Sequence, residues 1–586
     1  MSEAPDRPAA ARGDVEGPPA DAERWPLAVF ALLLAVVAAL VVTYELDPAG
    51  AATGWATDDV SRLLGLCSGL TAVGLLIYGG LRRWPWLHAP ARVRLLQATL
   101  SLWVLGGGVV YFYGMHGLVH RTYVHQWDAY HYLLGPKYFR ELGYFDLYRC
   151  TAQATPRAVI PDATKARDLR TYEVVTAGAL RRDGDCAALF TAARWQEFQG
   201  DVAVFGAEEP RRLRRMLLDH GYNGTPVHTA ITARVANLFP LRFTTLTLST
   251  LLDPLALCVM LAAITRAFGW RLGLVFALLL FTNVVDRFAI IGASFLRYLW
   301  LASLGLAFAA LGRGRHRVAG LCFTLAAALN VFPAVFALGL ALKAAVELIR
   351  TRTLAARYRQ LVLAAVVSAL ALGALGLTTG RGASAYAEFR DDMRVHLRDE
   401  RIPGFGVGLK YDFVYRGEHE KHTYSRAKKA KELAQARPVY LALAGLFIGL
   451  AGLVAARLDD VEAAALVGFT VLFCQLETTG YYFACAATLT LLYHRRAAAP
   501  GGLLMLALLF AINALDFYGY LRTHKYFTYN TIVSYSWTLY LALTLAYFGA
   551  ITGTFADWTR RLLQARSPAS APRAGAAPKE PASSDM

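Results

Sequence analysis

The stretch HQWDAYHYLLGPKYFRELGYFDLY, residues 125–148, contains the residue types from which a catalytic site can be built. It follows an apolar run that ends near Tyr113, and it holds five tyrosines and three potential cations, His125, His131 and Lys137. Asp128 is its first acid. Aromatic neighbours reduce the hydration of a carboxylate and can raise its pKa for proton abstraction, while the cations can neutralise a phosphate. We therefore take Asp128 as the leading candidate for a general base; the alternative is a simple helix cap.

A second polar stretch, DHGYNGTPVH at 219–228, precedes a later apolar run. Its polar candidates are Tyr222, Asn223, Thr225 and His228. Gly and Pro punctuate it, so a turn with no other role is one interpretation. Because the turn would re-enter the bilayer on the same side as Asp128, we keep the alternative that the two segments meet to form a site.

Several ionisable residues fall inside apolar runs, where they are costly to bury and usually face a cavity or a partner. Asp253 lies in the middle of a run, whereas others lie near run ends: Asp286, Arg287, Arg297 and Glu477. Snorkelling to lipid headgroups is the simplest interpretation of the end positions. Arg297 differs from the other residues, because it is followed by Tyr298 and Trp300 at the outer start of a predicted span. A lipid phosphate would lie at this level. We expect Arg297 to bind a phosphate.

The chain that carries these candidates is strongly apolar. Of its 586 residues, 56% are hydrophobic and only 18% are charged, with a mean hydropathy of +0.36. The apolar residues come in runs of about 17 to 25, the length that crosses a hydrocarbon core of ~30 Å. The sequence therefore predicts an all-α polytopic membrane protein. The net charge of +17 comes mostly from short loops, a pattern typical of orientation signals and attraction to membrane lipids. We find no nucleic-acid motif.

We predict about fourteen transmembrane helices, the first of which is an uncleaved span rather than a signal peptide. Their ranges are 27–43, 63–81, 95–113, 243–265, 272–291, 295–311, 318–330, 333–349, 361–378, 438–456, 461–476, 480–493, 501–517 and 531–553. Residues 25–94 thus hold two additional N-terminal spans, 95–113 precedes a catalytic loop, and 243–378 and 438–553 form the rest of the bundle. Residues 1–24 and 554–586 are predicted to be cytoplasmic tails, disordered over 1–24 and from about 562.

Basic loops set the predicted orientation, because Lys and Arg favour the cytoplasmic side. With both termini in the cytoplasm, every basic cluster lies on that side: Arg82, Arg83, Arg92 and Arg94; Arg266 and Arg271; Arg313, Arg315 and Arg317; Arg350, Arg352, Arg357 and Arg359; Arg495 and Arg496. Both flanks of residues 318–349 are basic, so we expect a helical hairpin that turns at 330–333. Pro333 suits the first turn of the returning helix.

This orientation leaves two large extracytoplasmic loops, 114–242 and 379–437. The first is long enough for its own small helices, for instance 187–199 and 208–219. It also holds Cys150 and Cys186, for which a disulfide and two free thiols remain equally open. The second contains SAYAEFRDDMRVHLRDE at 384–400, an amphipathic helix that we expect on the membrane surface.

The order of these motifs resembles the GT-C superfamily of integral-membrane glycosyltransferases, in particular its polyprenyl-phosphate-mannose-dependent branch. That branch has an Asp soon after a span, a Tyr four residues on, and then a Gly and a Leu-Tyr pair. Asp128, Tyr132, Gly143 and Leu147 with Tyr148 follow this pattern. GYNGTP at 221–226 partly resembles the Tyr-Pro-Pro-like turn of the family.

The resemblance extends over roughly residues 95–500. RGRHRVAGLCFTLAAALNVFP at 313–333 is similar to the family's basic loop and hairpin, with Asn330 where a Lys is expected. SFLR at 294–297 stands where a Gly-Gln-x-Asn element is expected. Arg297 is then expected to supply the charge that meets the lipid phosphate.

The resemblance implies a GT-C-like helical bundle and a transferase of the bacterial inner or plasma membrane. Such an enzyme moves a sugar, with inversion, from a polyprenyl-phosphate donor to a hydroxyl of a lipid, glycan or protein outside the cytoplasm. Asp128 would be the base. The substrate-binding residues would be His125, His131, Tyr132, Lys137, Tyr222, Asn223, His228, Arg297 and Asn330. No cofactor is predicted, and a divalent metal is neither required nor excluded. The alternative function is a transporter or flippase of lipid-linked saccharides.

Overall fold

The structure of the chain is a computed structural model. It describes residues 20–46, 55–119, 123–207, 209–286, 288–398, 406–414, 426–475, 479–497, 499–523, 526–557 and 559–560. The predicted disordered tails therefore lie largely outside the described residues, as do Arg287 and Glu477. Helix α1 already begins at Ala20, inside the range predicted as a tail.

The described chain is mostly helical with almost no sheet, which confirms the predicted all-α membrane class. Nine of its helical segments are long and apolar enough to cross a membrane. They belong to α1 (Ala20–Leu46), α2 (Thr57–Leu81), α3 (Pro90–Val109) with the π-helix η2 (Val110–Val119), α12 (Phe243–Ser249) with α13 (Leu252–Phe268), η6 (Phe332–Ala337) with α17 (Leu338–Thr351), α18 (Ala356–Gly376), α21 (Arg426–Ala455), α23 (Pro500–Thr523) and α24 (Tyr526–Ile551).

The remaining predicted spans also coincide with helices, but these are shorter. They are α14 (Trp270–Phe281), α15 (Leu299–Gly312), α16 (His316–Leu329), α22 (Asp460–Gln475) and the 3-10 helix η7 (Gly480–Tyr493). Fourteen spans therefore stay a prediction. At ~2.0 Å rise per residue, a 14-residue 3-10 helix is nevertheless about 28 Å long.

The predicted span 272–291 is wrong in its second half, because α14 ends at Phe281 and α15 begins only at Leu299. Between them the chain is irregular except for the short helix η5 (Phe288–Ile290). The side chain of Asn283 accepts the backbone N–H groups of Val285 and Asp286 at 2.9 and 3.3 Å. An Asn side chain that accepts hydrogen bonds from nearby backbone N–H groups competes with the backbone carbonyls of a helix for these donors. This competition favours the irregular path of the chain here.

Asp286 in this irregular segment does not snorkel to the surface. Its carboxylate is fully buried and accepts hydrogen bonds from the hydroxyls of Tyr111 and Tyr298, each at 3.2 Å. The residue helps to hold the segment inside the bundle, because a buried carboxylate needs such donors.

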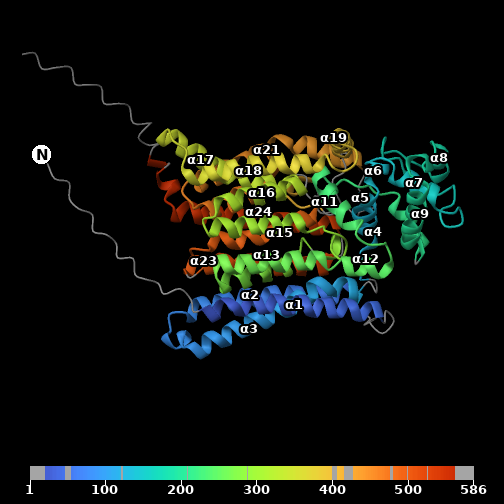
Figure 1. The fold of residues 1–586 in the computed structure, drawn as a ribbon. Helices are drawn as coiled ribbons and strands as arrows, with labels where there is room; N and C mark the ends of the chain where they lie inside the picture. Colours follow the sequence, from blue (N-terminus) through green and yellow to red (C-terminus); the bar gives the residue numbers. More distant parts are fainter. Residues whose placement is uncertain are drawn as a thin grey trace, which may run out of the picture.

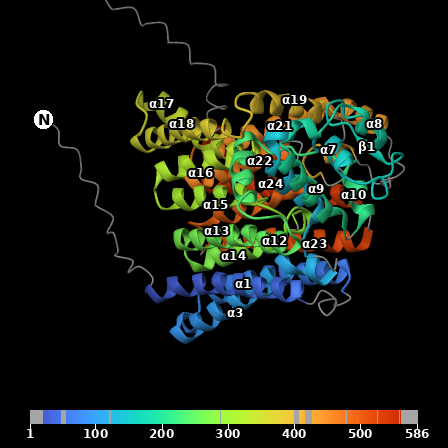
Figure 2. The same cartoon turned by 45° about the vertical axis from the view of Figure 1, so that its right-hand side comes forward.

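The long helices run side by side along the bundle, with α1 and α3 on one side and α17, α18 and α21 on the other (Figures 1 and 2). Helix α2 packs along α23, while α16 lies between α15 and α18. Helix α16 packs on α15 and α18, and α17 packs on α22 and α21, so the predicted helical hairpin of these two helices stays a prediction. His316 at the start of α16 and Lys343 in the middle of α17 both contact the carboxylate of Asp460, at 3.3 and 3.7 Å.

Basic loops that are distant in sequence meet at one end of the bundle. Arg313 donates to the carbonyl of Arg266 at 2.9 Å, and Arg357 lies 3.7 Å from Asp460. Arg495 pairs with the neighbouring Asp459 at 2.8 Å. Four of the basic clusters predicted to share one side of a membrane are thus joined by their contacts.

Residues 123–242 form a separate small unit at the opposite end of the bundle, which we call the loop domain (Figure 1). Its elements are α4 (Gln126–Ala129), the π-helix η3 (Tyr130–Leu134), α5 (Gly135–Lys137), α6 (Phe139–Leu142), α7 (Leu147–Ala154), β1 (Lys165–Arg167), β2 (Val174–Thr176), α8 (Ala177–Arg182), η4 (Ala187–Leu189), α9 (Ala192–Ala207), α10 (Pro210–Met216) and α11 (Pro226–Ala236). The two strands pair antiparallel, with Ala166 opposite Val175.

The loop domain has its own apolar core, formed by residues such as Leu133, Leu147, Phe198, Phe205 and Leu213. A disulfide joins Cys150 to Cys186, which resolves the alternative left open by the sequence. This covalent link restricts the unfolded chain of the loop domain and so stabilises its folded state.

The second large loop, predicted as 379–437, contains α19 (Ser384–Arg398) and α20 (Tyr411–Val414), and α21 already begins inside it at Arg426. Helix α19 packs on the loop domain: Phe389 contacts Tyr144, with ring centroids 5.8 Å apart, and His396 contacts Tyr172. We predicted that α19 lies on a membrane surface, but the sequence did not predict its contact with the loop domain.

Candidate active site

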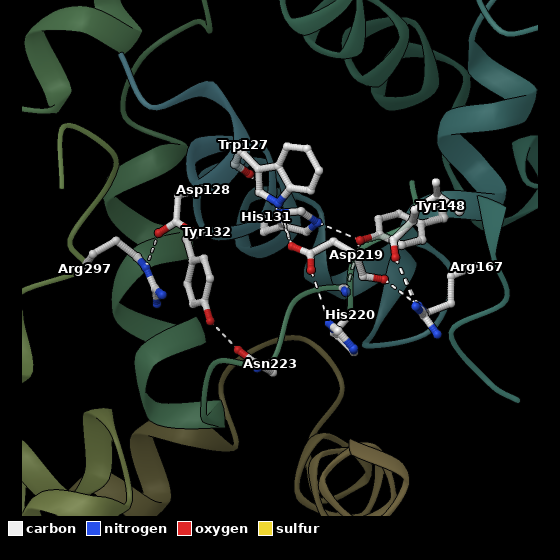
Figure 3. Close-up of polar contacts among 12 residues, drawn as sticks. Trp127, Asp128, His131, Tyr132, Tyr148, Arg167, Asp219, His220, Asn223 and Arg297 are labelled. Carbon is white, nitrogen blue, oxygen red and sulfur yellow. Dashed lines mark hydrogen bonds and ion pairs between the residues drawn. The ribbon is translucent and has the colours of Figure 1, made fainter. Parts of the chain in front are cut away.

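Asp128 and Arg297 form an ion pair where the loop domain meets the bundle. The Nε–H of Arg297 donates to Oδ2 of Asp128 at 2.5 Å (Figure 3). The two side chains are only 13% and 9% exposed. The two leading candidates from the sequence therefore make one unit, which comes from segments 169 residues apart.

Arg297 is held by its backbone as well as by its side chain. Asp253 in α13 is fully buried and accepts the backbone N–H groups of Arg297 and Tyr298 at 3.0 and 2.9 Å. Just before them, Ala293 and Leu296 adopt left-handed backbone conformations, with φ of 50° and 54°. Such conformations are unfavourable for residues with a Cβ and persist only where the surroundings impose them. Asp253 supplies part of that constraint.

An aromatic side chain covers the guanidinium group. The Cζ atom of Arg297 lies 3.3 Å from the ring centroid of Tyr132, the geometry of a cation–π contact. The hydroxyl of Tyr132 donates to Oδ1 of Asn223 (Figure 3). The polar turn predicted to meet Asp128 therefore reaches the Asp128–Arg297 pair through Tyr132.

Tyr222 and His228 lie directly behind this turn. The hydroxyl of Tyr222 is 3.0 Å from Nδ1 of His228 and 2.8 Å from Oγ1 of Thr229. Burial, together with the positive charge of Arg297, lowers the pKa of His228 to about 3. His228 is therefore neutral at physiological pH, so it offers the site hydrogen bonds rather than a charge.

Asn330 and His125 lie at the edges of the same region. Asn330 is the residue after α16, and the hydroxyl of Thr225 donates to the carbonyl of Ala328 two positions earlier. This contact joins the end of α16 to the turn at 221–226. The backbone N–H of His125 donates to the carbonyl of Ala293 at 2.7 Å, which ties the start of the loop domain to the irregular segment.

Lys137 does not join the site, contrary to the prediction that it neutralises a phosphate. Its ammonium group is buried and pairs with Asp201 at 2.6 Å and Glu197 at 2.9 Å. Both carboxylates lie on one face of α9, four residues apart, and they neutralise the charge. Lys137 therefore stabilises the loop domain.

His131 also points away from the pair, into a polar network of the loop domain (Figure 3). Its ring nitrogens lie 2.8 Å from the carbonyl of Trp127 and 2.7 Å from the hydroxyl of Tyr148. Burial lowers the pKa of His131, although Asp219 nearby opposes this effect. A neutral, fully bonded imidazole is poorly suited to bind a phosphate, so the structure does not support that role.

Two parts of the site were not identified from the sequence. Asp253 was noted only as a costly mid-span acid, and its partners lie 44 and 45 residues away. Tyr481 in η7, whose ring centroid is 5.9 Å from the Cζ atom of Arg297, gave no signal, because aromatic residues are common in apolar spans.

A potential metal-binding group lies at the other end of the bundle. In the described ranges, one set of three side chains brings its ligand atoms within 4.8 Å of one another: Asp459, Glu462 and His494. Arg495 and Arg496 form ion pairs with the two carboxylates. These pairs already balance the negative charge that would attract a cation.

Comparison of the chain with protein-family models, curated proteins and solved structures gave no match in any of the three searches.

Proposed function

We propose that this protein is an integral-membrane glycosyltransferase that uses a polyprenyl-phosphate sugar as donor and a hydroxyl group as acceptor, with inversion at the anomeric carbon. The observation that supports this proposal best is the Asp128–Arg297 pair, which joins a carboxylate to a phosphate-binding group beside aromatic side chains. It agrees with the resemblance to the GT-C superfamily carried by Asp128, Tyr132 and the turn at 221–226.

The short contact between the two groups suggests how donor binding activates the base. In the structure the Nε–H of Arg297 donates to Oδ2 of Asp128, so this carboxylate oxygen is already occupied. An incoming phosphate competes for the same N–H groups, because guanidinium binds phosphate strongly and with two parallel hydrogen bonds. Asp128 is then released to accept a proton.

The transfer step follows from these roles. Asp128 takes the proton of the acceptor hydroxyl as its oxygen forms a bond to the anomeric carbon of the donor. The bond from that carbon to the phosphate oxygen breaks on the opposite face, and the electron pair leaves with the phosphate. Arg297 stabilises the negative charge that develops there. Asn223 is partly exposed and can bond to a sugar, whereas Tyr132, Tyr222 and His228 are buried and support the turn that carries it.

The proposed orientation has the loop domain outside the cytoplasm and both termini inside, following the positive-inside pattern. Single cysteines at Ala163 and Ala499 test it in intact cells with an impermeant maleimide. The five free cysteines of the described chain are buried and give little background. We expect labelling at 163 and none at 499, whereas the reverse result would contradict the orientation.

A transporter or flippase for lipid-linked saccharides is the second candidate. The irregular segment between α14 and α15, with the buried Asp286, favours it, since many transporters bind their substrates at interrupted helices. Purified protein in vesicles that contain a labelled polyprenyl-phosphate sugar separates the two functions. Transfer of label to a hydroxyl acceptor supports the enzyme, whereas movement of intact donor across the bilayer without transfer contradicts it.

A further inference from the structure

An open groove of about 600 Å³ lies between α11 and the C-terminal end of α18. Its lining includes Arg234 from α11, Asn237 directly after this helix, and Thr378 and Thr379 from the turn that follows α18. The hydroxyl of Thr379 is buried and has no hydrogen-bond partner within the described chain. A buried hydroxyl without a partner is unfavourable, so this turn gains a hydrogen bond if it opens enough for a ligand oxygen in the groove to reach the hydroxyl.

The groove has an excess of positive charge. Arg234 is exposed, and its guanidinium donates to Oγ1 of Thr378 and to the carbonyl of Ala230, each at 2.6 Å. Arg140, also exposed, lies against Gly380, where an added Cβ would meet its side chain at 2.8 Å. Among the ion pairs of the described residues, neither arginine has a carboxylate partner. Arg234 therefore lines the groove with an uncompensated charge, and Arg140 lies outside the lining, next to Gly380.

The groove adjoins the helix that is least covered by protein. Only 6% of the apolar window of α18 is buried, compared with 28% or more for the other eight candidate spans. Large apolar side chains are exposed along it, namely Val362, Leu363, Val366, Val367 and Leu370. In a membrane this surface contacts acyl chains, so the groove at its end lies at the level of lipid headgroups.

We propose that this groove binds the phosphate of an anionic phospholipid from the surrounding bilayer, with the acyl chains along α18. Arg234 and the Thr379 hydroxyl hold the phosphate oxygens, and Arg140 adds to the attraction at the rim. Guanidinium and hydroxyl groups are strong partners for phosphate, and the lipid-exposed helix matches the acyl chains. The site is separate from the Asp128–Arg297 pair and does not depend on the proposed transferase activity.

Native mass spectrometry of the full chain, released from micelles doped with phosphatidylglycerol or phosphatidylcholine, tests the proposal. We expect wild type to retain phosphatidylglycerol preferentially, and Arg234→Gln to weaken this retention about ten-fold, the effect of losing a charged hydrogen bond. Arg140→Gln should weaken it less. Arg211→Gln, which changes an exposed arginine of α10 away from the groove lining, is the matched control.

An intact Cys150–Cys186 disulfide and an unchanged melting temperature verify that each variant is folded. Equal retention of the two phospholipids, or normal retention by folded Arg234→Gln protein, would contradict the proposal. So would displacement of phosphatidylglycerol by polyprenyl phosphate at equal concentration, because that result would assign the groove to the donor. A stable dimer that buries α18 and excludes phospholipid would contradict it as well.

Discussion

Asp253 holds the backbone of Arg297 from another helix, since its two carboxylate oxygens accept the N–H groups of Arg297 and Tyr298 at 3.0 and 2.9 Å. An amide in place of the carboxylate keeps only one acceptor and turns an N–H₂ group towards the second N–H. The irregular segment would then lose the contact that orients Arg297.

Asp253→Asn is therefore expected to lower kcat/KM for the donor by an amount that corresponds to about 1–3 kcal/mol. Because Asp253 acts through Arg297, its effect should shrink when Arg297 is already replaced by Gln. Steady-state kinetics of the two single variants and the double variant give this coupling. Fully additive losses would mean that Asp253 acts independently of Arg297.

The Asp128–Arg297 pair predicts a characteristic pattern of stability. Replacing one partner leaves the other charge buried and unpaired, and such losses commonly reach about 3–5 kcal/mol. Arg297→Gln should therefore melt at a lower temperature than wild type, while Asp128→Asn with Arg297→Gln should recover part of the loss. Thermal unfolding in a fixed detergent measures the effect. A double variant no more stable than Arg297→Gln alone would show that the pair does not exist in the folded protein.

The Cys150–Cys186 disulfide joins two residues of the loop domain that are 36 positions apart in the sequence. Replacing both cysteines by serine is expected to cost this domain about 2–5 kcal/mol. Limited proteolysis should then cut residues 150–190 much faster than in wild type. Cys258→Ala, which removes a free buried thiol from the bundle, is the control and should leave the loop domain resistant. Equal resistance of the double serine variant would argue against the link.

Asp392 predicts a pH effect on the docking of α19. Its side chain is buried against the loop domain, and Oδ2 has no hydrogen-bond partner among the described residues. Burial raises the pKa of Asp392 from 3.8 to about 8. The folded state therefore favours the protonated form, so this contribution to docking is complete below pH 4 and is lost as the pH rises through about 8.

Hydrogen exchange of residues 384–398 measures this change. In wild type, protection should fall between pH 5 and pH 9. Asp392→Asn should keep it constant, with a gain at pH 9 of about 1–3 kcal/mol. Asp391→Asn, at an exposed position next to it, is the matched control and should behave as wild type. Equal protection of wild-type α19 at both pH values would refute the effect.

The long apolar runs predicted most helices well, because a bilayer-spanning length and apolar composition are local properties. Residues 282–298 show where local information ends. Their irregular path depends on partners that are far away in sequence: Asn513 bonds to the backbone of Thr282 and Val284, and Tyr111 bonds to Asp286. A mostly apolar segment that contains Asn283 and Asp286 is predicted to be helical when its contacts with Asn513 and Tyr111 are not known.

Only part of the candidate site could be predicted, because local sequence does not show which distant segments come into contact. Asp128 and Arg297 each had a local signal, a polar residue at the edge of an apolar run, but their contact joins distant segments. Lys137 had an equally good local signal and was misassigned, because Glu197 and Asp201, which neutralise it, follow about 60 residues later. The spacing of residues 125–148 identified groups able to bind phosphate, but which of them are already paired depends on the fold.

The central claim is that Asp128 accepts the proton of the acceptor while Arg297 binds the donor phosphate. Asp128→Asn keeps the shape of the side chain, removes the proton acceptor and frees Arg297 for phosphate. Turnover of a labelled polyprenyl-phosphate sugar by the purified variant should fall by about 10²- to 10⁴-fold. Donor affinity, measured on the same preparation, should be unchanged or higher. Near-normal turnover with intact donor binding would contradict this account and would assign the base to another residue.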